Sequence, residues 1–395
     1  MPFSITREGF AYLFILAFVL AVAILRDINL MYAVAGLMIG PFLFNAALAA
    51  AIPRGLRVRR QMPATLEAGE TLTVHLSLAN PQRRLAAWLV VVADTLERHR
   101  APLRPRRVTA TAWFPHVPPG STRHSSYRGW LTERGRYRFG PLRVSCRFPL
   151  GLVRRTVTIE APGDVVVYPR LGELTEKAKA LWRQAARGDR PARRRGRAEA
   201  EFHGLRDWQR GDSRRWIHWR STARRGEIVV REFEQQEHHD LAIVLDLAAS
   251  GSPSPRQVDA IERAVSIAAT LVTGACAEPA ARVILAIAAE REVLLSGASS
   301  TKLRSEMLAA LAEVEAARVD EPSAARKHAA SRSAAFDGVS RIVRPDTPVL
   351  IVSANASDDR AAVGGVDPDR HRAANWITID ATKGGGEYVA LDVRG

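Results

Sequence analysis

Two long apolar runs near the start of the chain constrain its fold more than any other feature. Residues 10–25, FAYLFILAFVLAVAIL, carry no charge, and residues 30–52 form a second run in which Asn45 is the one strongly polar side chain. Because about 20 apolar residues span a bilayer core, the second run is long enough, and Ile28 helps to extend the first. We expect a hairpin of two transmembrane helices within residues 1–60.

A cleaved signal peptide is the alternative for the first run. Signal peptides begin with a positively charged region, whereas here Arg7 stands beside Glu8 and a second apolar run follows closely. The paired pattern therefore favours the transmembrane hairpin.

The charges that flank the two runs predict their orientation. Arg26 and Asp27 cancel in the turn, whereas the second run is followed by Arg54, Arg57, Arg59 and Arg60. Cytoplasmic flanks of membrane helices are rich in arginine and lysine. The two cysteines, Cys146 and Cys276, lack metal-ligand spacing, which suits a reducing compartment. We expect an inner-membrane protein whose soluble domains lie in the cytoplasm.

Short alternating runs of apolar and polar residues fill residues 61–170. TLTVHLSL at 71–78 and WLVVVADTL at 88–96 are two examples, and glycines and prolines separate such runs. This pattern is typical of antiparallel strands joined by turns. We expect a small all-β, sandwich-like domain. The segment EAGETLTVHLSLAN resembles the opening strand and turn of many immunoglobulin-like modules.

Residues 171–200 are polar and basic, and they include the cluster Arg193, Arg194, Arg195 and Arg197. The whole chain carries 57 basic and 41 acidic residues, a net charge of +16, which favours anionic surfaces such as the inner leaflet of a membrane. No aromatic residue stands within the cluster to stack on bases. We expect a basic linker and no nucleic-acid partner, with a nucleic-acid-binding membrane protein kept as an alternative.

Apolar runs alternate with helical patterns in residues 241–395. LAIVLDLA at 241–248 is a continuous apolar run, typical of a parallel strand buried on both faces. Helical patterns over 256–275 and 301–318 alternate with further strand-like runs at 281–289, 347–354 and 374–381. This order predicts an open, doubly wound, Rossmann-like α/β domain, with any ligand crevice at the carboxyl ends of the strands.

The segment between these domains, residues 201–240, is the most specific part of the sequence. Residues 201–234 contain three tryptophans and eight arginines. Since buried charges must be paired, these residues predict either an internal clamp or a partner-binding surface made of Arg206, Trp208, Asp212, Arg215, Trp219, Arg220 and Arg224. Within the clamp interpretation, Asp212 caps a helix over 213–223, and residues 227–234 form a strand beside 241–248.

This order of segments resembles the bacterial family that carries the domain of unknown function 58. The family's core motif, E-F-x-x-L-R-x-[YW]-x-x-G-D-x-x-R-x-I-x-W-x-x-[ST]-A-R, matches at Glu201, Phe202, Leu205, Arg206, Trp208, Gly211, Asp212, Arg215, Ile217, Trp219, Thr222, Ala223 and Arg224. Trp208 stands where a tyrosine is frequent. The resemblance implies a C-terminal domain similar to a von Willebrand factor type A fold and an association with MoxR-type AAA ATPases.

Domains of that type often hold Mg²⁺ through a D-x-S-x-S motif, a threonine and a second aspartate. Here the motif keeps Asp246 and Ser250 but lacks the first serine, and Thr301 is the candidate threonine. These three residues make at most a degenerate site, because one carboxylate with two hydroxyls is a poor ligand set for a hard cation. We expect no cofactor, with Mg²⁺ as the alternative.

Three functions stay open at this point. The one that we favour is a membrane-anchored adaptor without catalytic activity, which docks a protein partner, a MoxR-type AAA ATPase among the candidates, through its von Willebrand A-like domain. The second is a metal-dependent hydrolase that uses His203, Asp207, Asp212 and His218, or His238, His239 and Asp240. The third is the nucleic-acid-binding protein. Spacing disfavours the hydrolase, since Gly204 interrupts the first set and the second is consecutive.

Overall fold

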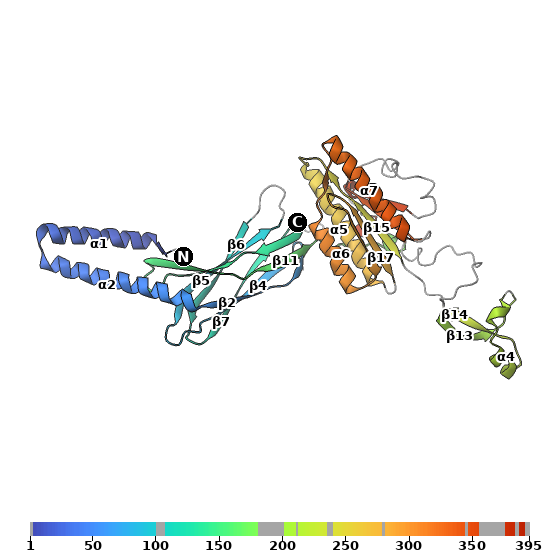
Figure 1. Ribbon diagram of the computed structural model, residues 1–395, viewed down its shortest axis with the longest axis horizontal. Helices are drawn as coiled ribbons and strands as arrows, with labels where there is room; N and C mark the ends of the chain where they lie inside the picture. The colour runs from blue at the N-terminus through green and yellow to red at the C-terminus, as the bar shows by residue number, and fades with distance from the viewer. Residues whose placement is uncertain are drawn as a thin grey trace. The chain divides into compact units, whose positions relative to one another are not determined.

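A computed structural model shows the arrangement of the elements (Figure 1) and describes residues 3–99, 107–180, 201–210, 212–234, 240–278, 281–343, 347–354, 376–383 and 387–391. The chain divides into two compact units, Met1–Arg170 and Leu171–Gly395. The first unit contains both the expected membrane anchor and the expected β domain. The second contains the expected α/β domain and the tryptophan-rich segment.

Two N-terminal helices, α1 (Arg7–Arg26) and α2 (Asn29–Ala51), form a hairpin. The Thr6 side chain caps α1 by accepting a hydrogen bond from Gly9 N, and Asp27, with φ of 47°, ends it. Both helices are long and apolar enough to cross a membrane. Only 11% and 17% of their apolar windows are buried, against 61% for α5 (Pro255–Ala277), which meets the same criterion of length and composition. The expected pair of membrane-type helices is therefore present.

The open end of this hairpin is fastened to the β domain. Strand β1 (Phe3–Ile5) pairs with β10 (Val153–Ile159), and Thr6 Oγ1 donates to Gly151 O at 2.7 Å. On α2, the buried Asn45 accepts a hydrogen bond from Val153 N at 3.1 Å. The polar interruption of the second apolar run is thus a contact with the β domain.

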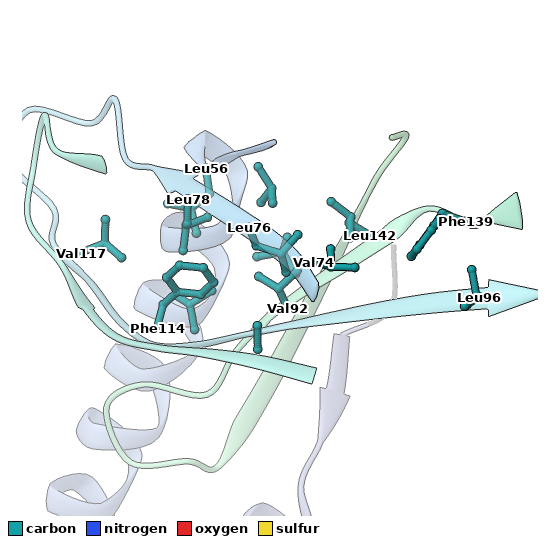
Figure 2. Packing of buried hydrophobic residues seen from close by; sticks show 14 of the residues in the cluster. Leu56, Val74, Leu76, Leu78, Val92, Leu96, Phe114, Val117, Phe139 and Leu142 are labelled. Atoms are coloured by element: carbon teal, nitrogen blue, oxygen red, sulfur yellow. The ribbon is translucent and has the colours of Figure 1, made fainter. Parts of the chain in front are cut away.

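Two sheets, antiparallel except for the parallel pair of β11 and β3, build the β domain around one core (Figure 2). The smaller has the order β2–β4–β7, with bounds Arg57–Gln61, Thr71–Ala79 and Thr122–Trp130. The larger has the order β1–β10–β9–β5–β8–β11–β3 with β6 on β5, and its remaining bounds are Leu142–Cys146 (β9), Ala87–Arg98 (β5), Gly135–Phe139 (β8), Gly163–Tyr168 (β11), Thr65–Glu67 (β3) and Arg107–Val117 (β6). Val74, Leu76 and Leu78 of β4 face the same core as Val92 and Phe114, because alternate residues of a strand share a face.

A buried ion pair connects the two sheets. Arg60 on β2 donates to both carboxylate oxygens of Asp94 on β5, at 2.9 and 2.7 Å, and also to Ala161 O and Gly140 O. Tyr127 donates to the same carboxylate at 2.7 Å. Burial raises the pKa of Asp94, while the hydrogen bonds from Tyr127 and Arg60 oppose that rise. Arg60 was expected to be a membrane-flanking charge, and this is wrong because its guanidinium is enclosed between the sheets.

The second unit contains a five-stranded sheet of order β18–β17–β15–β20–β21, in which only β18 is antiparallel to its neighbour. The strands are Val293–Ala298, Arg282–Ala288, Leu241–Asp246, Val349–Ser353 and Trp376–Asp380. Helix α7 (Pro322–Ile342) packs through Phe336 and Val339 on one face. Helices α5 and α6 (Thr301–Glu313) contact each other, and α5 also packs on the sheet (Figure 1). The expected α/β architecture is confirmed at this level.

The start of the expected linker belongs to this second unit. Strand β12 (Glu173–Leu174) pairs with β22 (Val389–Ala390), and Gly172 N donates to Thr270 Oγ1 at 2.8 Å. The arginine cluster of the linker lies outside the described residues. Residues 171–175 are therefore part of a folded unit, which the polar sequence did not indicate.

Candidate functional site

The tryptophan-rich residues 201–234 form a small unit that we call the tryptophan module. Strands β13 (Glu201–Asp207) and β14 (Val229–Glu234) pair antiparallel, and the 3₁₀ helix η2 (Arg214–Trp216) and helix α4 (Trp219–Arg225) lie between them. The expected strand beside 241–248 is wrong in its pairing. Both neighbours of β15 are other strands, β17 and β20, so no edge is left there for residues 227–234.

The expected single helix over 213–223 is also wrong. Ile217 forms a bridge with Val230, and His218 N donates to Val229 O at 2.8 Å, so the chain is extended between η2 and α4. Ser213 caps η2, and the His218 side chain caps α4 by accepting from Ser221 N. Backbone pairing with β14 therefore divides one helical pattern into two short helices.

Asp212 holds the turn after β13 and caps neither helix. Its two carboxylate oxygens accept from Arg206 Nη1 and Nη2, both at 2.8 Å, and Oδ2 also accepts from Gln209 N. The side chains of Arg206 and Asp212 are 34% and 11% exposed. A paired fork of this kind fixes both partners, so these two of the seven expected residues act on one another.

The other five expected residues lie on the surface of the module. Trp208 is 40% exposed and Trp219 is 68% exposed, and Arg215, Arg220 and Arg224 are also exposed. Among the side chains that the structure describes, no carboxylate contacts those three arginines. Leu205 and Ile228 are further exposed apolar side chains of the module. Trp208 and Trp219 are therefore not buried, as the internal clamp would require.

The three residues expected to form a degenerate cation site do not come together. Asp246 lies at the carboxyl end of β15, and Ser250 follows it, with its hydroxyl donating to Gln257 Oε1 at 2.9 Å. Thr301 follows β18, which runs antiparallel to β17, and Ser299 N bonds to Ala281 O just before β17 begins. Thr301 therefore stands at the opposite end of the sheet from Asp246.

Two side chains of α7 occupy the Asp246 carboxylate instead. His328 Nε2 lies 2.9 Å from Oδ1, and Arg332 Nη1 lies 3.8 Å from Oδ2. Because a carboxylate accepts hydrogen bonds, the histidine carries its proton on Nε2. The positive charge beside Asp246 thus comes from the chain itself, and the residues present do not fit a bound Mg²⁺.

Comparison with known proteins identifies the family. Residues 204–372 match the family model described as "Protein of unknown function DUF58". Residues 204–372 are therefore a DUF58 domain. It is also 27% identical over 259 residues to the "Uncharacterized protein YeaD" of Bacillus subtilis (strain 168), a match that covers 64% of this chain and 61% of YeaD. The chain thus matches about three fifths of the length of that curated relative.

Two solved structures are similar to a smaller part of this DUF58 chain. The CARDB domain of the PF1109 protein from Pyrococcus furiosus is 14% identical, with 29% of this chain and 94% of that chain covered, at a TM-score of 0.20. A β-glucosidase from Listeria innocua is 16% identical, with 28% and 16% covered, at a TM-score of 0.18. Scores this low carry no argument about fold or function.

Two of the residues considered for a hydrolase, His218 and Asp240, make other contacts in the DUF58 chain. The His218 ring contacts Ser221, and Asp240 accepts a hydrogen bond from Arg282 N. His238 and His239 lie outside the described residues, and the His203 side chain does so too. Among the described residues, no three His, Cys, Asp or Glu side chains gather as metal ligands.

One feature of the DUF58 chain was not found from its sequence, and a second lies where the sequence predicts a crevice. His328 and Arg332 stand four residues apart on α7, so they share a helix face, but nothing local indicated Asp246 as their partner. An open depression of about 520 Å³ lies at the carboxyl edge of the sheet, lined by Arg256, Gln257, Asp259, Ala260, Arg263, Ala354 and Thr382. Its position agrees with the crevice that a doubly wound sheet predicts.

Proposed function

We propose that this DUF58 chain is a membrane-anchored scaffold that docks an acidic protein partner through the tryptophan module. Helices α1 and α2 are the anchor, the soluble units lie in the cytoplasm, and no catalytic step is involved. The observation that carries the proposal is the exposure of Trp219, 68%, on a module rimmed by exposed arginines. Tryptophan and arginine are the residues on which binding energy most often concentrates at protein interfaces.

Charge supports an acidic partner. Residues 204–231 contain eight arginines and three carboxylates, and one carboxylate, Asp212, is already paired with Arg206. Arg220 and Arg224 stand four residues apart on α4 and are both exposed. Like charges on one helix face repel each other. An acidic partner surface would therefore reduce the repulsion between these two arginines as well as bind them.

The family resemblance suggests the identity of the partner. A MoxR-type AAA ATPase is the candidate, and a von Willebrand A-like nature of the α/β domain would suit an interaction role. The parallel sheet, with helices packed on it, supports this fold assignment. The Asp246 environment departs from it, since His328 and Arg332 occupy the carboxylate.

The test compares Trp219→Ala with Trp130→Ala. Trp130 is equally exposed, at 70% against 68%, but lies on β7 of the β domain. The full-length chain in detergent is titrated with the MoxR-type ATPase from the same genome. We expect Trp219→Ala to weaken binding about 30-fold, as for a hot-spot tryptophan, with an unchanged melting temperature, and Trp130→Ala to leave binding unchanged.

A charge reversal adds a second arm. Arg220→Glu with Arg224→Glu should weaken binding, and the loss should shrink in high salt because salt screens exposed charges. Arg59→Glu, an exposed arginine of β2, is the control. Unchanged affinity in both the tryptophan and the arginine variants would contradict the proposal that the tryptophan module is the docking surface.

A further inference from the structure

One end of the β domain exposes apolar side chains where the two helices join it. Trp88 is 41% exposed, Leu89 50% and Leu150 51%. Arg83, Arg84 and Arg147 are exposed at the same end. We call these six residues the collar.

Contacts within the first unit place the collar beside the open end of the helical hairpin. Gly151 O and Leu152 O, which follow Leu150, accept from the Thr6 hydroxyl, and Thr6 caps α1. Gln82, which precedes Arg83, donates to Ala51 O and Ile52 O at the end of α2. The two loops of the collar are therefore hydrogen-bonded to the N-cap of α1 and to the C-terminal end of α2.

Trp88 connects these loops. The Trp88 ring stacks on Phe148 with centroids 5.8 Å apart, and Phe148 packs against the core together with Leu48 of α2. The exposed helix surface begins one turn away, since Phe10 is 63% exposed and Phe44 is 60% exposed. The collar thus continues the apolar surface of the helices outward onto the β domain.

The backbone conformation at Leu89 keeps the Trp88 and Leu89 side chains exposed. Leu89 has a φ of 49°, in the left-handed region that is costly for a residue with a Cβ atom. Pairing between β5 and β6 skips it, and both Trp88 and Leu89 are exposed, whereas successive residues of a regular strand point to opposite faces. A costly conformation that turns two large apolar side chains outward indicates a surface with a binding role.

We propose that the collar sits in the headgroup region of the membrane that α1 and α2 cross and binds anionic lipid there. The inference rests on the membrane anchoring in the proposed function. Tryptophan is enriched at membrane interfaces, and arginines next to a transmembrane helix are attracted to anionic headgroups. The collar combines both at the level where the helices leave the bilayer, which fixes the β domain against the membrane surface.

Depth measurements with spin labels test the proposal. Labels are placed by Leu89→Cys and by Leu150→Cys in the full-length chain with Cys276→Ala, reconstituted in vesicles of phosphatidylglycerol and phosphatidylcholine. Cys146 is kept, because it is buried and burial raises the pKa of its thiol, which suppresses labelling. Val108→Cys is the matched control, since Val108 is 47% exposed at the opposite end of the β5–β6 pair.

The expected result is a ratio of oxygen to nickel-complex accessibility several-fold higher at Leu89 and Leu150 than at Val108. A label at Leu37, 76% exposed on α2, reports the anchor itself. Aqueous values at Leu89 and Leu150 with a hydrocarbon value at Leu37 would contradict membrane binding by the collar but agree with the membrane anchor. An aqueous value at Leu37 would overturn the anchor, and the collar with it.

Charge reversal tests the lipid class. In the chain labelled at Leu150, Arg84→Glu with Arg147→Glu should make the label shallower in vesicles that contain phosphatidylglycerol and leave it unchanged in pure phosphatidylcholine. Arg128→Glu, exposed near the far end of β7, is the control and should change neither value. Equal depth in both lipids before and after the charge reversal would contradict anionic lipid binding.

Discussion

At the scale of single residues, Arg60 shows that a distant partner can bury a charge that its sequence neighbours suggest is exposed. It follows the second apolar run as one of several arginines, yet its side chain is 4% exposed and its partner Asp94 is 1% exposed. Its guanidinium also lies 4.6 Å from the centre of the Phe139 ring. Since the partner is 34 residues away, no local signal in the sequence could distinguish Arg60 from its exposed neighbour Arg59.

Removal of the Asp94 charge should destabilise the β domain strongly. Asp94→Asn leaves the Arg60 charge buried without its counter-ion, which costs about 3–5 kcal/mol of unfolding free energy. Asp164→Asn is the matched control, because its pair with Arg138 has side chains that are 40% and 64% exposed, and exposed pairs contribute about 0–1 kcal/mol. Denaturant unfolding in detergent, followed by tryptophan fluorescence, measures both. Similar losses in the two variants would contradict the assignment.

The same cluster predicts a dependence on alkaline pH. Burial and the Asp94 carboxylate raise the pKa of Tyr127 above its ordinary value. A raised folded-state pKa gives stability that is complete below the unfolded pKa of about 10 and is lost as pH rises above it. Tyr127→Phe should cost about 1.5–3 kcal/mol at pH 7 through the lost hydrogen bond, and that difference should shrink above pH 10. A difference that stays constant up to pH 11 would contradict this prediction.

The contacts of Asp246 predict that magnesium does not change the stability of the α/β unit. Millimolar MgCl₂ should leave the unfolding midpoint of the α/β unit unchanged, because His328 and Arg332 already occupy the carboxylate. His328→Gln should cost about 1.5–3 kcal/mol, the range for hydrogen bonds to charged groups. Thr301→Ala, an exposed position at the other end of the sheet, should change stability by less than about 0.5 kcal/mol. A midpoint that rises with Mg²⁺ in the native chain would argue for a cation site.

At the scale of elements, the tryptophan module shows that a sequence pattern can locate helical turns without predicting where they end. The apolar and arginine spacing over 213–223 suggested one helix, and helical turns do form at each end of it. Its middle is extended because Ile217 and His218 pair with β14, and their partners Val230 and Val229 lie 13 and 11 residues further along the chain. Local propensity therefore located the helices, and a non-local backbone pairing decided where they break.

Gly226 allows a test of α4 by itself. It ends the helix with a φ of 75°, so Gly226→Ala should cost about 1 kcal/mol and reduce hydrogen-exchange protection of the α4 amides about fivefold. Gly204→Ala is the control, since a Cβ there meets nothing within 4 Å and its φ lies outside the left-handed region. Equal protection in the two variants would mean that α4 does not depend on this cap.

At the scale of the whole molecule, the parts best predicted from sequence are those in which one simple rule dominates. The two apolar helices have the length that a bilayer core requires, and burial on both faces makes parallel strands continuously apolar. Both were predicted within a few residues. Positions that depend on distant partners, such as Asn45 with Val153 or Asp246 with His328, were not, because their partners are separated by 108 and 82 residues.

The joint between helices and β domain predicts how truncation acts. A chain that begins at residue 56 lacks β1 and Asn45, so β10 loses its edge partner and Val153 N loses its acceptor. We expect a lower melting temperature of the β domain and aggregation through the opened edge. A flexible insertion between Asp27 and Ile28 keeps both ends of the hairpin and should leave the melting temperature unchanged. Equal melting temperatures in the truncated and full-length chains would contradict this dependence.

The pairing of β1 with β10 also has a consequence for biosynthesis. Thr6 and Gly151 are 145 residues apart, and synthesis at roughly 5–20 residues per second separates them by on the order of ten seconds. During that interval the N-terminal strand has emerged and its partner has not. The proposed membrane anchor must therefore keep β1 on the same side of the membrane as β10, and this sheet edge closes only after β10 has been synthesised.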